Sequence, residues 1–574
     1  MSKLRGDIMS KMPLVSIMCG LLLSACAQKN DANDIIQTPI NPKGTQKEVI
    51  SDEAKAELLI EGNWFTRDPI LNSEEGVSSD KALAQLQLPE ASEVIVAVID
   101  SGVDTEHEDL QGKIWFNPGE TGLDENGNDK ASNGIDDDQN GYVDDIHGWN
   151  FIGGADGSHI DYESLEMTRE LVRFKAKLSS GIELSDEEKL YFEKVQKAVA
   201  DEREYANSRI EKYQPVGDKI EAMKKLLQEK LGLKEFTKSS LEAISSSDEE
   251  VIAAKDHLLQ TIAKFGSVNR IASSLEYYHA ILDYYTNESF DPRSEIVKDD
   301  PSDFSDTQYG NNDVKGPDAG HGTHVSGIIA AVRGNGLGVD GIAPNVKIMA
   351  LRAVPNGDER DKDIALAIKY AADNGARIIN MSFGKAFSPY KEKVDEAFMY
   401  AAEKGVLIMN AAGNDNANTD VVRSFPNKYL KSSAYSLAEV PAFLSVGASS
   451  RIKGLALPAS FSNYGKESVD FFAPGHRILS TTPENSYDVY SGTSMACPAA
   501  AGVAALVLGH YPDLSAVQLA EILKRTSRLY SSLEVRLPGA EQFDLPVAFE
   551  SLSLTGGVVD AYSALEFTKY LAEH

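Results

Sequence analysis

The sequence predicts an α/β fold: a doubly wound, mostly parallel sheet with an inserted α-helical subdomain. Short apolar runs rich in β-branched residues alternate with stretches of helical length, which is typical of parallel strands covered by helices. A second region, residues 157–305, has few glycines, many Glu and Lys, and an apolar period close to 3.6 residues. With 574 residues, the chain exceeds one ordinary core, so we expect more than one structural unit.

Apolar runs predict the buried strands of the sheet. They are Val94–Asp100, Val346–Val354, Ala376–Phe383, Val406–Gly413 and Phe443–Ala448. Helices are expected at Asp363–Gly375 and Val394–Gly405, each ending in a glycine suited to a C-cap. Binding sites in such sheets form at the carboxyl ends of strands, where Asp100, Ser382 and Asn414 occur.

The region 157–305 is predicted to be a set of amphipathic helices without catalytic residues. Leu184–Tyr213 opens with Ser185 and Glu188 in the spacing of a capping box, and Gly217–Gly232 is predicted to be a separate short helix. Further helical patterns cover Asp248–Gly266 and Ser274–Tyr285. Two interpretations stay open: a bundle packed on one edge of the α/β domain, or a lid, partner site or regulator.

Residues 1–26 are predicted to be a signal peptide. Basic residues precede the apolar stretch Met12–Leu23, which is too short for a stable membrane-spanning helix. The segment then reads Leu-Ser-Ala-Cys and resembles the bacterial lipobox, which implies a lipid on Cys26. A plain secretory signal and an uncleaved anchor with a buried cysteine are the alternatives. Residues 27–58 are polar and are interpreted as a tether, so 59–156 and 306–574 form the two parts of the α/β domain.

Charge and cysteine content exclude some partners and some sources of stability. The chain has 88 acidic and 56 basic residues and a net charge of -32, so a nucleic-acid partner is not expected, because phosphate binding needs a positive face. An acidic surface serves solubility or indicates bound cations. Cys19, Cys26 and Cys497 cannot form a disulfide framework, so stability has to come from packing or metal. We expect a monomer.

Three separate stretches together predict nucleophilic catalysis. Asp100 ends a strand in VAVIDSGVD, His321 lies among glycines in GHGTHVSG, and Ser494 opens an apolar helix in SGTSMACP. Taken alone, each has an ordinary role, as a helix cap or a structural histidine. Taken together, a serine hydroxyl, an imidazole that takes its proton and a carboxylate that orients the imidazole form a catalytic triad. Their order along the chain is Asp, His, Ser.

These stretches resemble the motifs of the subtilisin-like serine proteases. The match covers residues 60–155 and 310–565 and includes NMSFG at Asn380–Gly384 and AAGND at Ala411–Asp415. FSNYG at Phe461–Gly465 and FFAPG at Phe471–Gly475 also fit. The resemblance implies a serine endopeptidase that hydrolyses peptide bonds of proteins or peptides through an acyl-enzyme. With the N-terminal signal, it implies an enzyme anchored by lipid to the bacterial cell envelope.

The resemblance assigns roles to individual residues. Asp100 orients His321, which acts first as general base and then as general acid, and Ser494 attacks the scissile carbonyl. Asn414 donates to the oxyanion, together with the backbone N–H of Ser494. His324 matches a structural histidine of the family. The residues implied to bind the substrate are Ser382, Phe383, Gly384 and Gly413.

Two further features near the site have more than one interpretation. Cys497, one turn after Ser494, is interpreted as a buried packing residue, or as a thiol close enough to the site for mercurials to inhibit. The stretch Gly357–Asp363 reads GDERDKD and, in the resembled fold, flanks the non-prime side of the substrate cleft. It either selects charged substrate side chains, or Asp361 or Asp363 caps a helix among solvated neighbours.

The stretch Asn133–Asp145 predicts a structural calcium site. Asp136, Asp138 and Asn140 alternate before a glycine, as in the first half of a D-x-[DN]-x-[DN]-G loop. Asp144 or Asp145 is expected to close the ligand shell, whereas His147 at the twelfth position excludes a full EF-hand. The alternative is a solvated Asp/Asn turn.

Two other functions are alternatives to the peptidase. A catalytically silent member would act as a binding or scaffolding protein through its helical region, and an esterase would use the same triad. The intact triad, Asn414 and NMSFG favour the peptidase. The stretch before Asn63 leaves no room for a sizeable folded prodomain, so either folding needs none or the helical region serves instead.

Overall fold

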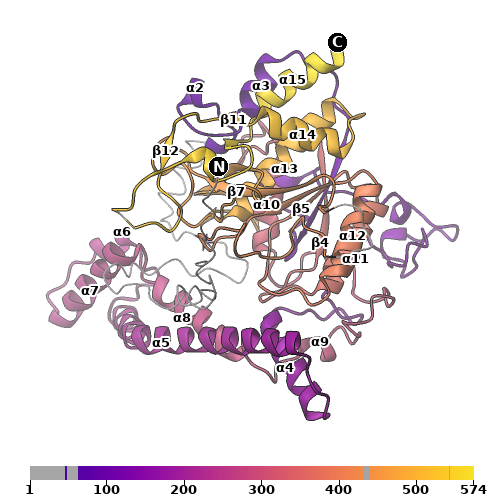
Figure 1. Cartoon of the computed structure of the whole chain (residues 1–574). Coiled ribbons are helices and arrows are strands. Elements are labelled where there is room, and N and C mark those ends of the chain that lie inside the picture. Colours follow the sequence, from indigo (N-terminus) through magenta and orange to yellow (C-terminus); the bar gives the residue numbers. More distant parts are fainter. Residues whose placement is uncertain (1–45, 48–62, 432–437, 542) are drawn as a thin grey trace, which may run out of the picture. The chain divides into compact units, whose positions relative to one another are not determined.

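The computed structural model describes residues 46–47, 63–431, 438–541 and 543–574, which belong to one compact unit. The predicted signal peptide, Cys26 and most of the predicted tether lie outside the described residues. The chain is a mixed α/β protein, as the sequence predicts (Figure 1).

A nine-stranded sheet forms the centre of the described chain, with the order β11-β14-β8-β7-β6-β5-β2-β4-β3. All neighbouring pairs are parallel except β11 and β14, which are antiparallel. The strands are β2 (Val94–Asp100), β3 (Gly148–Asn150), β4 (Val346–Arg352), β5 (Ile378–Met381), β6 (Leu407–Ala411), β7 (Phe443–Ser449), β8 (Phe471–Pro474), β11 (Arg528–Leu529) and β14 (Gly557–Val558). The five predicted strands are therefore confirmed, with shorter bounds at β4, β5 and β6.

Helices cover both faces of this sheet. Val96 and Val98 of β2 belong to a core shared with α10 (Gly320–Ala330) and α13 (Thr493–His510). The alternate residues Ala97 and Ile99 pack against α11 (Asp361–Asp373) and α12 (Lys391–Glu403) on the opposite face. This period of two places both helix layers against fully buried strands, as expected for a doubly wound sheet.

The remaining elements near the sheet are short or peripheral. Helices α3 (Ser79–Gln85), α14 (Ala516–Thr526) and α15 (Ala561–Glu573) lie on the α13 side. A small antiparallel sheet contains β1 (Gln46–Lys47), β9 (Ile478–Thr482) and β10 (Ser486–Ser491), and β12 (Glu534–Val535) pairs with β13 (Val547–Ala548). Single turns are α2 (Pro69–Asn72), η1 (Trp64–Thr66), η2 (Glu108–Leu110), η3 (Pro118–Glu120), η4 (Lys130–Ser132) and η6 (Phe549–Ser551).

Helix α13 is the one described helix with the length and apolar composition to cross a membrane. Nearly all of it is buried inside the protein, where it packs against β5, β6, β7 and β8. Its apolar character is therefore explained by its place in the core.

The chain between β3 and α10 is mostly helical (Figure 1). Its elements are α4 (Glu166–Ser179), α5 (Asp186–Leu231), α6 (Lys238–Glu242), α7 (Glu249–Phe265), α8 (Arg270–Ala280), the π-helical turn η5 (Ile281–Tyr285) and α9 (Pro292–Glu295). Ser185 and Glu188 form the predicted capping box at the start of α5.

The prediction of two separate helices, Leu184–Tyr213 and Gly217–Gly232, was wrong. They form one continuous helix of 46 residues that passes through Pro215. One buried stripe, with Tyr213, Gly217 and Ile220, runs across the proline. A Cβ on Gly217 would lie 2.7 Å from Leu275 of α8, so close packing against α8 favours the continuous helix over the local preference of proline to end it.

Candidate active site

Asp100 and His321 form a buried pair where β2 meets α10. Asp100 is the last residue of β2 and is 1% exposed. The Nδ1 atom of His321 lies 2.7 Å from Oδ1 and 2.9 Å from Oδ2 of Asp100. A Cβ on Gly322 would lie 2.2 Å from the carbonyl oxygen of Gly102, so glycine at this position permits the close approach of helix and strand. The imidazole therefore uses Nδ1 for the carboxylate, which assigns Nε2 to the reacting group.

Ser494 is the second residue of α13 and is hydrogen-bonded to Ser382, the residue that follows β5. Its hydroxyl donates to the carbonyl oxygen of Ser382 at 3.1 Å, and the hydroxyl of Ser382 donates to the carbonyl oxygen of Ser494 at 2.9 Å. The side-chain amide of Asn380 donates to Ser382 Oγ at 3.0 Å. The N-terminal end of α13 adds a positive dipole beside the Ser494 hydroxyl.

Asn414 follows β6 and is oriented by the residue before Ser494. Its Oδ1 accepts hydrogen bonds from the backbone N–H of Thr493 at 2.8 Å and from the Thr493 hydroxyl at 3.0 Å. Because Oδ1 is the acceptor, the other arm of the amide is the NH₂ donor. Gly413 has a φ of +101° and donates its N–H to the Thr493 hydroxyl at 3.1 Å, so a left-handed turn places Asn414 against α13.

The backbone after β5 provides an unpaired edge. The peptide groups of Phe383 and Gly384 have no backbone partner among the described residues. The side chain of Phe383 is buried, whereas Gly384 is exposed. An extended peptide adds to such an edge through main-chain hydrogen bonds.

His324 and Cys497 are packing groups. Nε2 of His324 contacts the carbonyl oxygens of Ile478 and Asp488, both at 3.1 Å, and burial lowers its pKa to about 3. Cys497 is fully buried in the core beside Met381, and burial raises the pKa of its thiol. The interpretation of Cys497 as a buried residue agrees with this environment, and His324 is uncharged and enclosed.

The predicted calcium loop includes a carboxylate that the sequence did not indicate. Ligand atoms of Glu120, Asp136 and Asp138 lie within 4.8 Å of one another. Glu120 is fully buried, its Oε1 accepts the N–H of Asp137 at 2.8 Å, and its Oε2 has no partner among the described residues. Burial, with the charges of Asp145 and Asp138, raises the pKa of Glu120 to about 7. A buried oxygen without a partner, facing two carboxylates, fits a hard cation.

The predicted ligands Asp144 and Asp145 are not part of that group. Asp144 accepts the N–H of Gly134 on both oxygens at 3.1 Å. Asp145 accepts hydrogen bonds from Tyr370, Asn117 and Asn140. Neighbouring donors thus orient both carboxylates, and the expectation that Asp144 or Asp145 closes the ligand shell stays a prediction. Glu120 was missed because it lies 16 residues before Asp136, beyond any local motif.

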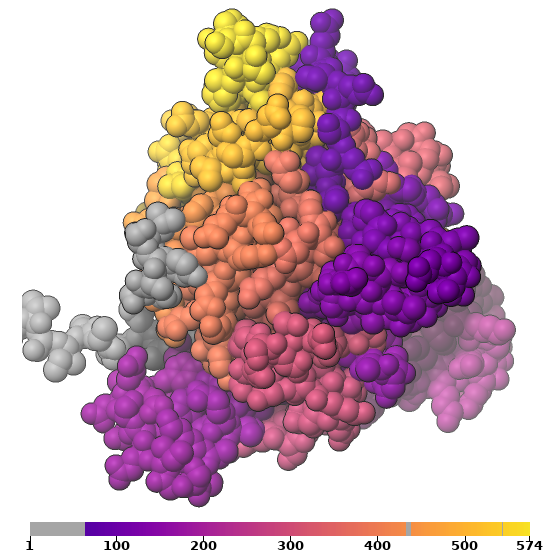
Figure 2. Space-filling view, turned by 90° about the vertical axis from the view of Figure 1, so that its right-hand side faces the viewer, coloured from indigo at the N-terminus to yellow at the C-terminus, as the bar shows by residue number. Residues whose placement is uncertain are grey.

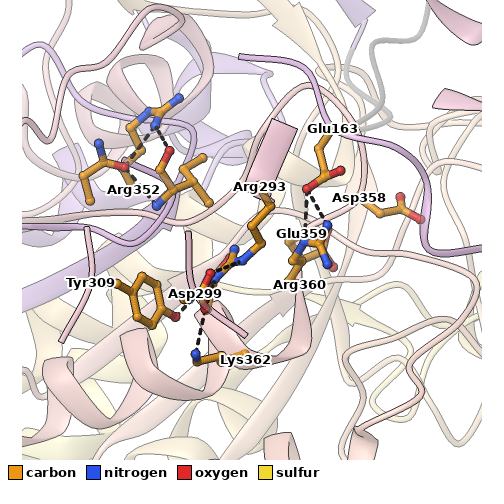
Figure 3. A network of polar contacts seen from close by, with 12 residues as sticks. Glu163, Arg293, Asp299, Tyr309, Arg352, Asp358, Glu359, Arg360 and Lys362 are labelled. Atoms are coloured by element: carbon orange, nitrogen blue, oxygen red, sulfur yellow. Dashed lines mark hydrogen bonds and ion pairs between the residues drawn. The ribbon is translucent and has the colours of Figure 1, made fainter. Parts of the chain in front are cut away.

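The stretch Gly357–Asp363 was interpreted either as a selector of charged substrate side chains or as a helix cap among solvated neighbours, and the second interpretation was wrong. Asp361, Lys362 and Asp363 are all buried, and the N-cap residue of α11 is Arg360, which makes no side-chain cap. These charges belong to a network that includes Glu163, just before α4, and Arg293 of α9 (Figure 3).

Arg293 of α9 is the centre of one half of this network. It is 1% exposed and pairs with Asp299 at 2.7 Å and Asp363 at 2.6 Å. Lys362 contacts Asp299 at 2.6 Å, and the Tyr309 hydroxyl donates to Asp363 at 2.6 Å. The charge of Asp363 and the bonds to both carboxylates raise the pKa of Arg293, although burial alone would lower it. The network fixes α9 against α11.

The chain is similar to known proteins over most of its length. The Subtilase family model matches residues 91–544. The chain is 41% identical over 206 residues to the thermophilic serine proteinase of Bacillus sp. (strain AK1), which covers 36% of this chain and 45% of that protein. It is 40% identical over 229 residues to the cell wall-associated protease of Bacillus subtilis (strain 168), a match that covers 39% of this chain and 23% of that protein. It is 37% identical over 212 residues to subtilisin DY of Bacillus licheniformis, a match that covers 36% of this chain and 70% of that protein. The chain thus spans less than half the length of the first two relatives.

Proposed function

Because this chain belongs to the Subtilase family, we propose that it is a serine endopeptidase that hydrolyses peptide bonds of proteins through Ser494. The observation that carries the proposal is the buried Asp100–His321 pair, with Nδ1 of the imidazole 2.7 Å from the carboxylate. A triad needs this contact, because an imidazole fixed in one tautomer accepts a proton through Nε2. Ser494 at the start of α13 and Asn414 beside it supply the nucleophile and the oxyanion donor.

The residues support the following reaction. Nε2 of His321 takes the proton of the Ser494 hydroxyl as Oγ attacks the scissile carbonyl. The amide NH₂ of Asn414 and the backbone N–H of Ser494 stabilise the oxyanion. His321 then gives the proton to the leaving amine, and water hydrolyses the acyl-enzyme by the same steps. The edge at Ser382, Phe383 and Gly384 holds the substrate as an added strand.

Comparing wild type with Ser494→Ala tests this proposal. Purified wild type should degrade an unfolded protein substrate, and Ser494→Ala should lose that activity while keeping its melting temperature. Degradation by both proteins at the same rate would contradict the proposal, as would intact substrate after long incubation with wild type. Sedimentation of Ser494→Ala, which cannot digest itself, also tests the expectation that the protein is a monomer.

Calcium is proposed as a structural ion held by Glu120, Asp136 and Asp138. Bringing three carboxylates together without a cation is unfavourable, and the partnerless Oε2 of Glu120 is the observation that supports an ion. An ion bound only to the folded state stabilises the protein by mass action.

Lipid anchoring to the cell envelope through Cys26 is proposed from the signal-peptide and lipobox pattern alone. Mass spectrometry of the protein from bacterial membranes should find an N-terminal lipid-modified Cys26, and Cys26→Ser should release the protein from the membrane fraction. An unmodified mature terminus elsewhere would contradict anchoring without affecting the enzymatic proposal.

A further inference from the structure

The free edge after β5 ends at Gly384. The next residue, Lys385, donates its backbone N–H to Phe425 at 2.8 Å and accepts the N–H of Phe425 at 2.9 Å. An added peptide strand can therefore pair only with Ser382, Phe383 and Gly384. At about 3.3 Å per residue, this edge is about 10 Å long.

Helices α4 and α5 cover the chain beyond Gly384. The ammonium group of Lys385 lies 2.8 Å from Glu166 of α4 and 2.8 Å from Asp361. Phe387 is buried in a cluster with α4 and α5, whose members are Met167, Leu171, Val195 and Val199. Both charge pairing and apolar packing thus hold the helices over the path that a longer substrate would follow.

This covered end contains more acidic than basic groups. Its carboxyl groups are those of Glu163, Glu166, Asp358, Glu359 and Asp361, and its cations are Arg169, Arg360 and Lys385. The carboxylates of Glu163, Glu166 and Asp361 have cationic partners within 4 Å. Asp358 and Glu359 form no ion pair among the described residues.

Asp358 and Glu359 are both enclosed, at 9% and 2% exposed. One oxygen of Asp358 accepts the N–H of Glu166 at 2.8 Å, whereas Oε1 of Glu359 has no hydrogen-bond partner in the described chain. Glu359 also lines a small cavity together with Phe383 and Lys385, at the end of the substrate edge. In Figure 3 the dashed lines join Glu163 to Arg360, and none reaches Asp358. Arg169 and Lys385 donate to the backbone carbonyl oxygens of these two residues, but no described cation lies within ion-pair distance of their carboxyl groups.

We propose that Asp358 and Glu359 form a subsite for the α-amino group of the substrate at the closed end of the cleft. The proposal rests on the proposed peptidase function and changes its expected products, because bonds about three residues from a free amino terminus would be cut in preference to internal bonds. An ammonium group supplies the missing positive charge and three N–H donors. Because α4 and α5 cover the chain beyond Gly384, a substrate that ends there fits better than a substrate whose chain continues.

A series of peptides with one scissile sequence tests the length limit. We expect kcat/KM to be highest with three residues before the scissile bond and to fall at least tenfold with six. Acetylating the amino terminus of the best peptide should lower kcat/KM by about tenfold or more, the effect of losing a charge-assisted hydrogen bond. An acetylated peptide with lysine at its first residue tests whether a side-chain ammonium group can replace the α-amino group. Values of kcat/KM that keep rising up to six residues, or that do not change on acetylation, would overturn the proposal.

Isosteric variants test the two carboxyl groups. Asp358→Asn and Glu359→Gln keep the side-chain shape and remove the charge, so each should reduce the preference for the free over the acetylated peptide. Glu403→Gln removes an exposed carboxyl group from the far end of α12 and should leave that preference unchanged. An unchanged ratio in the double variant Asp358→Asn/Glu359→Gln would refute the subsite.

Labelling of Ser494 by a fluorophosphonate separates the two proposals. If wild type is labelled and cuts long proteins internally as readily as short free peptides, the amino-terminal subsite is wrong and the peptidase function stands. If wild type neither reacts with the label nor cuts any peptide, the peptidase function itself fails.

Discussion

Nδ1 of His321 contacts both carboxylate oxygens of Asp100, at 2.7 Å and 2.9 Å, inside the protein. The contact holds the imidazole in the tautomer that accepts a proton at Nε2. Asp100→Asn offers an NH₂ group instead and favours the other tautomer. We expect kcat to fall by about 10⁴-fold with little change in KM. A loss below tenfold in steady-state kinetics, with the fold intact by circular dichroism, would contradict the role of Asp100.

Asn414 is expected to act on the transition state. Asn414→Asp keeps the acceptor for Thr493 but removes the NH₂ donor, so kcat should fall by about 10²–10³-fold while KM changes little. Thr493→Ala is the matched control, because it removes one bond to Oδ1 and leaves the amide in place. Equal losses in both variants would mean that Asn414 acts by holding α13 and does not act on the oxyanion.

The raised pKa of Glu120 should make the proposed calcium binding depend on pH. The folded chain keeps this proton up to about pH 7, whereas the ordinary pKa is 4.5. Without calcium, the contribution of Glu120 to the free energy of unfolding is therefore largest below pH 4.5 and is lost as the pH rises through 7. Calcium competes with this proton, so the gain in melting temperature from calcium over chelator should grow between about pH 5 and 8.

Calorimetry with calcium and with chelator measures this difference directly. Glu120→Gln should flatten the pH dependence, and Glu125→Gln, which changes an exposed carboxyl group of the preceding loop, should not. Identical melting curves with calcium and chelator across the pH range would rule out the site.

Arg293 should be essential for stability. Removing it leaves Asp299 and Asp363 buried without their shared partner, so Arg293→Met should lower the free energy of unfolding by about 3–5 kcal/mol. Lys225→Met on the exposed face of α5 is the control and should change it by less than about 0.5 kcal/mol. Urea unfolding of Ser494→Ala backgrounds, which cannot digest themselves, gives both values. Equal free energies of unfolding for Arg293→Met and Lys225→Met would show that the network contributes little to stability.

The Cys497 thiol should resist modification in the folded protein. It is enclosed in the core and its pKa is raised, so thiolate is scarce and access is blocked. Alkylation followed by peptide mapping should label Cys497 only after unfolding. Labelling of the folded enzyme, with loss of activity, would favour the alternative of a thiol open to the active site.

The sequence was most informative where local chemistry determines structure. β2 has the bounds predicted from its β-branched run, and Ser185 caps α5 as its spacing indicates. Asp100 and His321, 221 residues apart, meet as the motif pattern implies.

It was least informative where distant segments decide the environment of a residue. Pro215 and Gly217 resemble a helix boundary, yet packing on α8 keeps α5 continuous. The charges of Gly357–Asp363 could be interpreted as solvated because their partners, such as Glu163 and Arg293, lie far away in the sequence. Glu120 joins Asp136 only through the fold. Figure 2 shows that segments of very different colour, which are far apart in the sequence, adjoin on one face of the molecule.

Fluorophosphonate labelling with peptide mapping tests the central claim most directly. We expect a single modified residue, Ser494, in wild-type protein with calcium, and no modification in His321→Ala, because the hydroxyl is then not activated. Modification of another residue, or equal labelling of wild type and His321→Ala, would contradict the assignment of Ser494 as a nucleophile activated by His321.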